Sequence, residues 1–291
     1  MEKTAFITMD VESFYDTSCV KAKFPCENQN QNFSCAEEIL NFAELLQKYD
    51  CKATFFITGT FIDEIKKYFP ALIRSKNEIS LHCYKHVSPL TQNLDEFDEE
   101  IKKACHLIKE NSGVFPAGYR APCFGIDDER LKIVRQNQMK YDSSFMDTSL
   151  SVYNGRINMD GYKKINDSLY EKNGFYECVP SVVKFLGIKY PVSGGAYLRI
   201  PPYFFVKILL KKYLKNADSY LFYVHPFEIS KKRLPLSKKF SLAEILYINR
   251  GRRRYLKRIE KIFILLKKYG YTFYTIGDFA EKIKNPEEKN V

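Results

Sequence analysis

The sequence predicts a single-domain α/β protein with a mostly parallel sheet or a barrel. Apolar runs of strand length alternate with amphipathic helical segments, and no Gly-, Ser- or Pro-rich linker divides the 291 residues. Repeated βα units within one domain give a parallel sheet or a barrel. A single core extends over at most about 250–300 residues. We therefore expect residues 1–291 to form one domain.

The N-terminal half begins with a strand and repeats the strand–helix order. Thr4–Met9 is a short apolar run, which is typical of a buried strand. Ser34 and Glu37 have the spacing of a capping box, which predicts a helix that ends near Lys48. After it we expect a strand at Cys51–Thr58, helices at Thr60–Tyr68 and Pro70–Ser75, a strand running into His82, and a helix from Leu94 to Ile108 with His106 on its surface.

The C-terminal half continues this alternation around one polar stretch. Residues 147–174 show no apolar period and are predicted to be irregular. Elsewhere we expect strands at Ala117–Arg120, Met139–Asp142, Phe175–Val179, Tyr220–Val224 and Tyr271–Ile276, and helices at Asp127–Asn137, Pro201–Lys215 and Arg252–Lys268. The last helix is predicted to bury Tyr255, Ile259, Ile262, Phe263 and Leu266.

The charge balance favours an anionic partner. The formal net charge is +11, and a basic surface attracts nucleic acid, anionic lipid or phosphorylated substrates. No zinc-finger, RNP-like or helix-turn-helix pattern is present, so we expect no nucleic-acid partner. The basic cluster around Arg252 is interpreted as the solvated start of a helix, with membrane or phosphate binding as the alternative.

Cysteine usage and the N-terminus favour a cytoplasmic protein. The eight cysteines form no C-x-x-C pair, which is typical of free, buried thiols in a reducing compartment. Met1–Thr4 leads directly into a strand and does not resemble a signal peptide. No apolar run approaches the roughly 18 residues that span a bilayer.

Two of the four histidines, His82 and His86, form an H-x-x-x-H pair. In a helical turn, positions i and i+4 lie on one face, so both imidazoles would reach the same small ion. Zinc binds neutral histidine nitrogen, and a catalytic zinc site takes three protein ligands. A carboxylate from elsewhere in the chain is the expected third ligand.

Charged residues follow several of the predicted strands. Asp10 and Glu12 would share a face in an extended chain, although an exposed turn explains them equally well. In parallel folds the chemistry lies at the C-terminal ends of the strands. The residues found at such predicted ends are Asp10, His82, Arg120, Asp142 and His225.

These residues belong to a set of short motifs. The motifs are Thr8-Met-Asp-Val-Glu12, Glu78-Ile-Ser-Leu-His-Cys-Tyr-Lys-His86, Gly118-Tyr-Arg-Ala-Pro122, Tyr141-Asp-Ser-Ser144, Ser193-Gly-Gly195 and His225-Pro-Phe-Glu228. With them the chain resembles a polysaccharide deacetylase of the NodB-homology type, carbohydrate esterase family four. The resemblance implies a deformed (β/α) barrel that removes an N-acyl group from a sugar.

The resemblance also implies a role for each motif residue. Asp10 matches the general base and Arg120 the arginine that orients it, while His225 matches the general acid. Glu12, His82 and His86 match the ligands of one divalent metal ion, for which we expect zinc. The most familiar form of the family has two adjacent aspartates. Here Val11 separates Asp10 from Glu12, so the roles of the two carboxylates remain interchangeable and Asp16 remains a further candidate.

Other residues are expected near the substrate. They are Phe124, Asp142, Gly194, Gly195 and Arg199. A backbone N–H near Cys123 or Phe124 would form part of an oxyanion hole. Asp142 has the alternative of capping a turn with Ser143 and Ser144, and the two glycines have the alternative of an ordinary turn.

The functional hypothesis is a cytoplasmic, metal-dependent carbohydrate deacetylase. Its expected partner is an N-acylated sugar, such as a cell-surface glycan precursor, with peripheral contact at the inner face of an anionic membrane. Two alternatives remain. One is a deformylase or other amidohydrolase on a lipid-phosphate-linked or non-sugar substrate, and the other is a non-catalytic glycan-binding barrel.

Overall fold

The computed structural model describes the chain except residues 1, 24–32, 149, 151–154, 237–238 and 285–291. The strands are β1 Lys3–Val11, β2 Thr54–Thr58, β3 Glu78–Cys83, β4 Gly118–Tyr119, β5 Tyr141–Asp142, β6 Lys163–Asn166, β7 Leu169–Lys172, β8 Phe175–Cys178, β9 Val182–Phe185, β10 Ile188–Pro191, β11 Ser219–Val224 and β12 Tyr271–Tyr274. The main sheet has the order β11-β1-β2-β3-β4-β5-β8-β7-β6, with β12 paired to the first half of β1. Neighbours from β11 to β8 run parallel, and β6 and β7 form an antiparallel edge.

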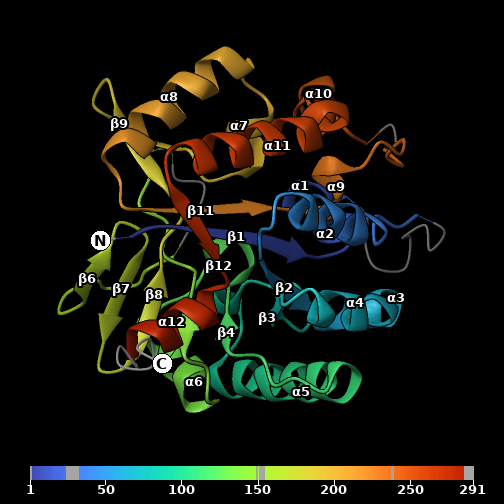
Figure 1. Ribbon diagram of the computed structural model, residues 1–291. Helices are drawn as coiled ribbons and strands as arrows, with labels where there is room; N and C mark the ends of the chain where they lie inside the picture. Colours follow the sequence, from blue (N-terminus) through green and yellow to red (C-terminus); the bar gives the residue numbers. More distant parts are fainter. Residues whose placement is uncertain (1, 24–32, 149, 151–154, 237–238, 285–291) are drawn as a thin grey trace.

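Helices surround this sheet. They are α1 Ser18–Lys21, α2 Glu38–Lys48, α3 Ile62–Ile65, α4 Phe69–Arg74, α5 Leu94–Ser112, α6 Asp128–Gln136, α7 Gly195–Arg199, α8 Tyr203–Asn216, α9 Pro226–Ile229, α10 Leu242–Asn249, α11 Arg252–Lys268 and α12 Ile276–Lys284. Figure 1 shows α8, α10 and α11 along one side of the molecule and α5 and α6 along the opposite side. Among the described residues, no helix is long and apolar enough to cross a membrane.

The sheet curls into an open barrel. Its two edges approach each other where Ser168 N–H donates to Ser219 Oγ (2.7 Å) and Ser181 N–H donates to the Leu221 carbonyl (3.3 Å). These hydrogen bonds join the edges without a continuous ladder. The predicted α/β fold with a deformed barrel is therefore confirmed.

Alternation along β1 separates the core from the barrel interior. Ala5 and Ile7 belong to the large core beneath the helices, whereas Phe6 packs in a second cluster inside the sheet. Successive strand residues point to opposite faces, so Asp10 points into the same interior as Phe6. Helix α12 closes the end near Phe6, where the rings of Phe6 and Phe279 lie 5.2 Å apart. The end near Asp10 stays open for a site.

Several local predictions need correction. The Ser34–Glu37 capping box does not form: Ser34 Oγ accepts from Ala36 N–H, and α2 begins at Glu38 without a side-chain cap. The segment predicted as one helix at Thr60–Tyr68 is divided into short helical turns. Residues 147–174 are not all irregular, because β6 and β7 form a hairpin there. Their polar side chains suit a sheet edge, where one face is open to water.

Candidate metal and active site

The carboxyl ends of β1, β3 and β11 open into one cavity of about 270 Å³. Because these strands are parallel, their carboxyl ends meet at the same edge of the sheet. The side chains that line the cavity include those of Asp10, Glu12, His82, His86, Phe124, Arg199, Tyr223, His225, Glu228 and Tyr247.

Glu12, His82 and His86 direct one donor atom each toward a common point, and these atoms lie within 4.8 Å of one another. Glu12 Oε2 lies 2.6 Å from His86 Nε2 and 3.6 Å from His82 Nε2. All three side chains are buried. Burial would raise the pKa of Glu12, but the nearby His86 and His225 charges hold it well below its usual range. The group is thus ionised and suited to a cation.

The two histidines reach this point from a strand and the loop after it, not from the helical turn that their spacing suggested. His82 lies in β3, and His86 follows with a φ of 49°, in the left-handed region. Cys83 Sγ accepts a hydrogen bond from His86 N–H (3.0 Å), and Lys21 Nζ donates to the His86 carbonyl (2.7 Å). These contacts fold the chain back, so that the imidazole of His86 returns beside His82.

The orientation of His82 is fixed by a hydrogen bond to the backbone. Its Nδ1 lies 2.6 Å from the Arg120 carbonyl oxygen. A carbonyl only accepts, so we assign the ring proton to Nδ1, which leaves the Nε2 lone pair for an ion. Histidines that bind metals are commonly held in this way.

Asp10 and Arg120 form a buried ion pair. Arg120 Nη1 donates to Asp10 Oδ1 (2.6 Å) and to Thr8 Oγ1 (2.8 Å). Nη2 donates to Ser143 Oγ (2.8 Å), and the guanidinium lies over the Phe56 ring. Arg120 is fully buried, and this set of contacts fixes the carboxylate of Asp10 in one orientation.

His225 lies on the other side of Asp10. Its Nε2 is 3.8 Å from Asp10 Oδ2, and its Nδ1 is 3.0 Å from Glu228 Oε2. Burial disfavours the charged imidazole, but the carboxylates of Glu12, Glu228 and Asp10 outweigh that effect and raise the pKa of His225 to about 9. His225 is therefore a proton donor at neutral pH.

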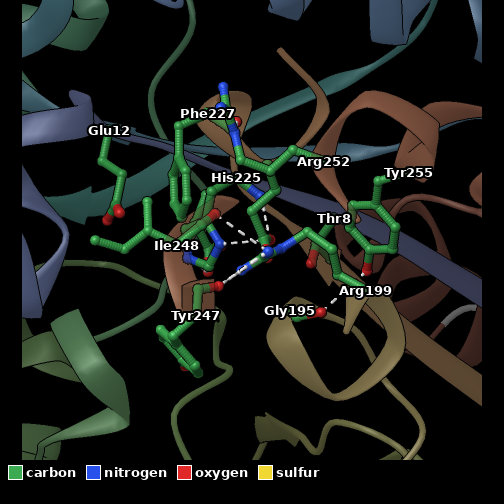
Figure 2. A network of polar contacts seen from close by, with 12 residues as sticks. Thr8, Glu12, Gly195, Arg199, His225, Phe227, Tyr247, Ile248, Arg252 and Tyr255 are labelled. Carbon is green, nitrogen blue, oxygen red and sulfur yellow. Dashed lines mark hydrogen bonds and ion pairs between the residues drawn. The ribbon is translucent and has the colours of Figure 1, made fainter. Parts of the chain in front are cut away.

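Arg199 holds Glu228 in place, and Figure 2 shows Arg199 beside the backbone of Tyr247 and Ile248. Arg199 Nε donates to Glu228 Oε1 (2.9 Å), while its Nη1 and Nη2 donate to the carbonyl oxygens of Tyr247, Ile248 and Arg250. Arg199 and Glu228 are each only 2% exposed. His225 is thus connected through Glu228 to the arginine that anchors the end of α10.

Comparison with known proteins agrees with this geometry. The family model described as "Polysaccharide deacetylase" matches residues 36–141. The predicted resemblance to the polysaccharide deacetylase family is therefore confirmed, and residues 36–141 carry it. A second model, a domain of unknown function, matches residues 143–275.

Three known proteins are similar to this chain in sequence or in fold. The peptidoglycan deacetylase of Helicobacter pylori is 27% identical over 187 residues, which are 64% of this chain and 60% of that protein. The structure of the peptidoglycan deacetylase PdaC from Bacillus subtilis has a TM-score of 0.52 at 16% identity, covering 99% of this chain and 95% of that chain. A CE4 family pseudoenzyme from Bacillus anthracis has a TM-score of 0.54 at 15% identity, covering 96% and 66%. Because deacetylases and a pseudoenzyme share the fold, the fold alone does not decide activity.

The residues that the deacetylase resemblance suggested for substrate contact divide into two groups. Phe124, Gly195 and Arg199 line the cavity. The guanidinium of Arg199 is bound to Glu228 and to backbone carbonyl oxygens, so Arg199 stabilises the cavity wall. Gly194 packs against β11 with φ 145°, and there is no room for a Cβ, which would lie 1.9 Å from the Tyr223 carbonyl oxygen.

Asp142 lies beneath the site and does not line the cavity. Its two carboxylate oxygens accept from Ser144 N–H and Ser144 Oγ (both 2.8 Å), which is the turn cap considered as an alternative. Burial raises its pKa to about 6, and the buried Glu177 is adjacent to it. Because Ser143 and Ser144 bond Arg120 and Ala121, Asp142 supports the Asp10–Arg120 pair from below.

Glu228 lies in a sequence motif but was not predicted to have a role, and Tyr223 and Tyr247 were not predicted to line the cavity. A signal for Glu228 was present. Pro226 favours the first position of a helix, so His225 becomes the N-cap and Glu228 the third helical residue of a capping box. That geometry brings the two side chains together. Nothing comparable in the sequence marks either tyrosine.

Proposed function

We propose that this chain is a metal-dependent hydrolase that removes an N-acyl group, such as acetyl, from a sugar. The observation that carries the proposal is the placement of three groups around one cavity. A Glu-His-His cluster, an aspartate held by a buried arginine, and a histidine with a raised pKa are all within reach of one bound amide. The similar proteins of Helicobacter pylori and Bacillus subtilis, both peptidoglycan deacetylases, support an N-acetylated sugar as the substrate.

The donor set fits a divalent metal ion. Glu12, His82 and His86 supply one oxygen and two nitrogens, which is a known ligand set for catalytic zinc. The Nδ1 hydrogen bond of His82 matches the outer support that metal-binding histidines receive. When bound, such an ion acts as a Lewis acid toward a carbonyl oxygen and a water molecule. Zinc remains our proposal for its identity.

Asp10 is suited to act as the general base. Its carboxylate lies at the cavity wall and is oriented by Arg120 Nη1 at 2.6 Å. A carboxylate held in one orientation by an arginine can accept a proton from an attacking water. Of the two expected donors, the backbone N–H of Cys123 is our candidate for stabilising the oxyanion, because the Phe124 N–H donates to the Ala121 carbonyl (3.0 Å). Both residues have positive φ values at the cavity rim, 52° and 56°.

His225 is suited to act as the general acid. Breaking an amide C–N bond requires a proton on the departing amine, because an amide anion is a poor leaving group. The raised pKa keeps His225 protonated at neutral pH, and its Nε2 faces Asp10 across the cavity. The proton taken by Asp10 and the one given by His225 balance the hydrolysis, which yields a free amine and a carboxylic acid.

We also propose a cell-surface glycan precursor as the natural substrate and the cytoplasm as the location. Among the described cysteines, Cys35, Cys51, Cys83, Cys105 and Cys178 are free, buried thiols, which supports a reducing compartment. The relatives' substrate supports a sugar destined for the cell wall. The acyl group is acetyl in this proposal, with formyl as the variant that the same chemistry would accept.

A release assay tests the proposal. The metal-loaded protein and the chelated protein would be incubated with N-acetylated and N-formylated sugars, free and linked to nucleotide or lipid phosphate, and released acetate and formate would be measured. We expect acetate release that chelation abolishes and that added zinc restores. If the protein bound metal but released no acetate or formate from any sugar, the alternative of a non-catalytic glycan-binding barrel would be favoured. Release of acetate or formate only from non-sugar amides would exclude a carbohydrate substrate.

A further inference from the structure

Exposed apolar side chains gather on one side of the molecule. The large hydrophobic residues that are more than a third exposed, among those the structure describes, are Leu94, Val114, Phe115, Leu150, Leu186, Ile188, Phe204, Ile208, Leu242, Leu246, Tyr247 and Ile264. Eight of these twelve residues belong to the β9–β10 hairpin, α8, α10 and α11. They are Leu186, Ile188, Phe204, Ile208, Leu242, Leu246, Tyr247 and Ile264. Single exposed hydrophobics are normal, but a cluster on one face indicates a contact surface.

The β9–β10 hairpin and α8 form the first part of this surface. Leu186 occupies the hairpin tip with 84% of its surface exposed. The hairpin is packed on α8 through the rings of Phe185 and Phe205, whose centroids are 6.1 Å apart. On α8, Phe204 and Ile208 are one turn apart and are 69% and 56% exposed. The tip and the outer side of α8 therefore present apolar groups together.

Helix α10 forms the second part. Its eight residues bury only Ile248, while Leu242 and Leu246 are 73% and 56% exposed. Tyr247, 53% exposed, also lines the catalytic cavity. The apolar side of α10 thus lies directly beside the cavity mouth.

Cations accompany these apolar groups. The outer positions of α8 carry Lys207, Lys211, Lys212 and Lys215, and those of α11 carry Arg253, Arg254, Lys257, Lys261, Lys267 and Lys268. Between Leu242 and Lys268 the acidic residues are Glu244 and Glu260, and each is already paired with a lysine, Lys23 or Lys48. Helices α8 and α11 adjoin, because Lys261 Nζ lies 5.0 Å from the centroid of the Tyr203 ring. The surface is therefore apolar and strongly cationic at once.

We propose that this surface, formed by the β9–β10 hairpin, α8, α10 and α11, docks on an anionic lipid bilayer. Apolar side chains that project from a cationic helical face are the pattern of proteins lying in the membrane interface. Anionic headgroups complement the lysines and arginines, and the acyl region accepts the tip leucine and the α8 side chains. A nucleic acid or a soluble polyanion would complement the charge but not the apolar groups. Docking would hold the cavity mouth at the lipid surface, and it does not depend on the proposed hydrolysis.

Vesicle binding of the full chain tests the proposal. The protein would be sedimented with phosphatidylcholine vesicles that contain or lack phosphatidylglycerol. The first variant, Lys207→Gln/Lys211→Gln, removes two cations from α8, and the second, Leu186→Gln/Phe204→Gln, removes two apolar groups. The matched controls on the opposite side are Lys109→Gln/Lys132→Gln and Val114→Gln/Phe115→Gln. Thermal unfolding would verify that each variant is folded.

We expect binding to the anionic vesicles alone. The cation variant should bind about 25-fold more weakly, because each lysine at the membrane surface contributes about fivefold to the affinity. The apolar variant should bind at least about tenfold more weakly, and both controls should stay within about twofold of the parent. Equal binding to neutral vesicles, or equal losses in the controls, would overturn the proposal. The proposal would also be overturned if the protein bound heparin as tightly as it binds the anionic vesicles and if the apolar variant bound heparin as tightly as the parent does.

A spectroscopic variant gives an independent readout. The chain contains no tryptophan, so Phe204→Trp introduces a single reporter on α8, and Phe115→Trp is its control. On anionic vesicles the emission of the first should shift to shorter wavelength, because the indole leaves water. The emission of the second should not change. An unshifted Phe204→Trp spectrum on vesicle-bound protein would contradict insertion of this surface.

Discussion

His225 Nδ1 lies 3.0 Å from Glu228 Oε2, and this contact turns the other ring nitrogen toward Asp10. The pairing arises within four residues, because His225 is the N-cap of α9 and Glu228 is its third residue. Arg199 then fixes Glu228 from the opposite side at 2.9 Å. The proposed acid therefore owes its direction to Glu228, and Glu228 adds to the effect of Glu12 in raising the pKa of His225.

Replacement of Glu228 tests that dependence. In Glu228→Gln the carboxylate that raises the pKa of His225 is lost while the amide preserves the shape. The activity of a general acid falls as pH rises through its pKa, so the alkaline limb of kcat/KM should move to lower pH. The limb of the parent should lie at or below pH 9, because the pKa of His225 is raised to about 9 and a bound cation would oppose that rise. A full pH–rate profile measures the position of the alkaline limb in both proteins. A limb at the same pH in both would show that Glu228 does not influence the pKa of the general acid.

Removal of His225 tests the acid itself. His225→Ala should lower turnover by roughly 10²–10⁴-fold and flatten the alkaline limb. Metal content should not change, because Glu12, His82 and His86 are left in place. Turnover and metal stoichiometry would be measured on the same preparation. A variant that lost its metal would show that His225 is a ligand or a structural support instead.

The thiol of Cys83 offers a test of the metal site from outside it. Its Sγ accepts the His86 N–H at 3.0 Å and so stabilises the left-handed turn. Cys83→Ala should weaken zinc affinity by about 10–100-fold, the usual effect of losing an outer contact. Cys105→Ala, another buried cysteine but in α5, serves as the control and should keep the parent affinity. Equal affinities in the two variants, measured by competition with a chelator, would mean that the turn does not need the thiol.

Gly194 tests the close approach of the 193–195 loop to β11. A Cβ at this position would lie 1.9 Å from the Tyr223 carbonyl oxygen, and φ is 145°. Gly194→Ala should therefore lower the free energy of unfolding by about 3 kcal/mol or more. Gly174→Ala has a φ of 76° but nothing within 4 Å, so it should cost only about 1–2 kcal/mol. Urea unfolding compares the two, and similar losses would contradict the steric argument.

The sequence predicted the fold and the region of the site well for one physical reason. Runs such as Thr4–Met9 and Tyr220–Val224 are largely apolar because both faces of a parallel strand are covered. Their carboxyl ends must then meet at one edge, which is where the structure brings Asp10, His82 and His225.

The remaining features depend on the local backbone conformation, which the spacing of residues in the sequence does not determine. The distance between His82 and His86 fits a helical turn as well as a strand followed by a left-handed residue, and only the second occurs. Asp142 ends a strand like Asp10, but its side chain turns to Ser144. The β6–β7 hairpin was missed because an edge strand tolerates the polar residues that are typical of loops.

The central claim is that Glu12, His82 and His86 hold the metal while Asp10 acts as the base. The most direct test measures zinc content and acetate release in parallel for Glu12→Gln, His82→Ala, His86→Ala and Asp10→Asn. We predict that the first three lose metal and activity together, and that Asp10→Asn retains most of its metal but not its activity. An Asp10→Asn protein without metal beside a Glu12→Gln protein that keeps it would contradict this assignment and exchange the two roles.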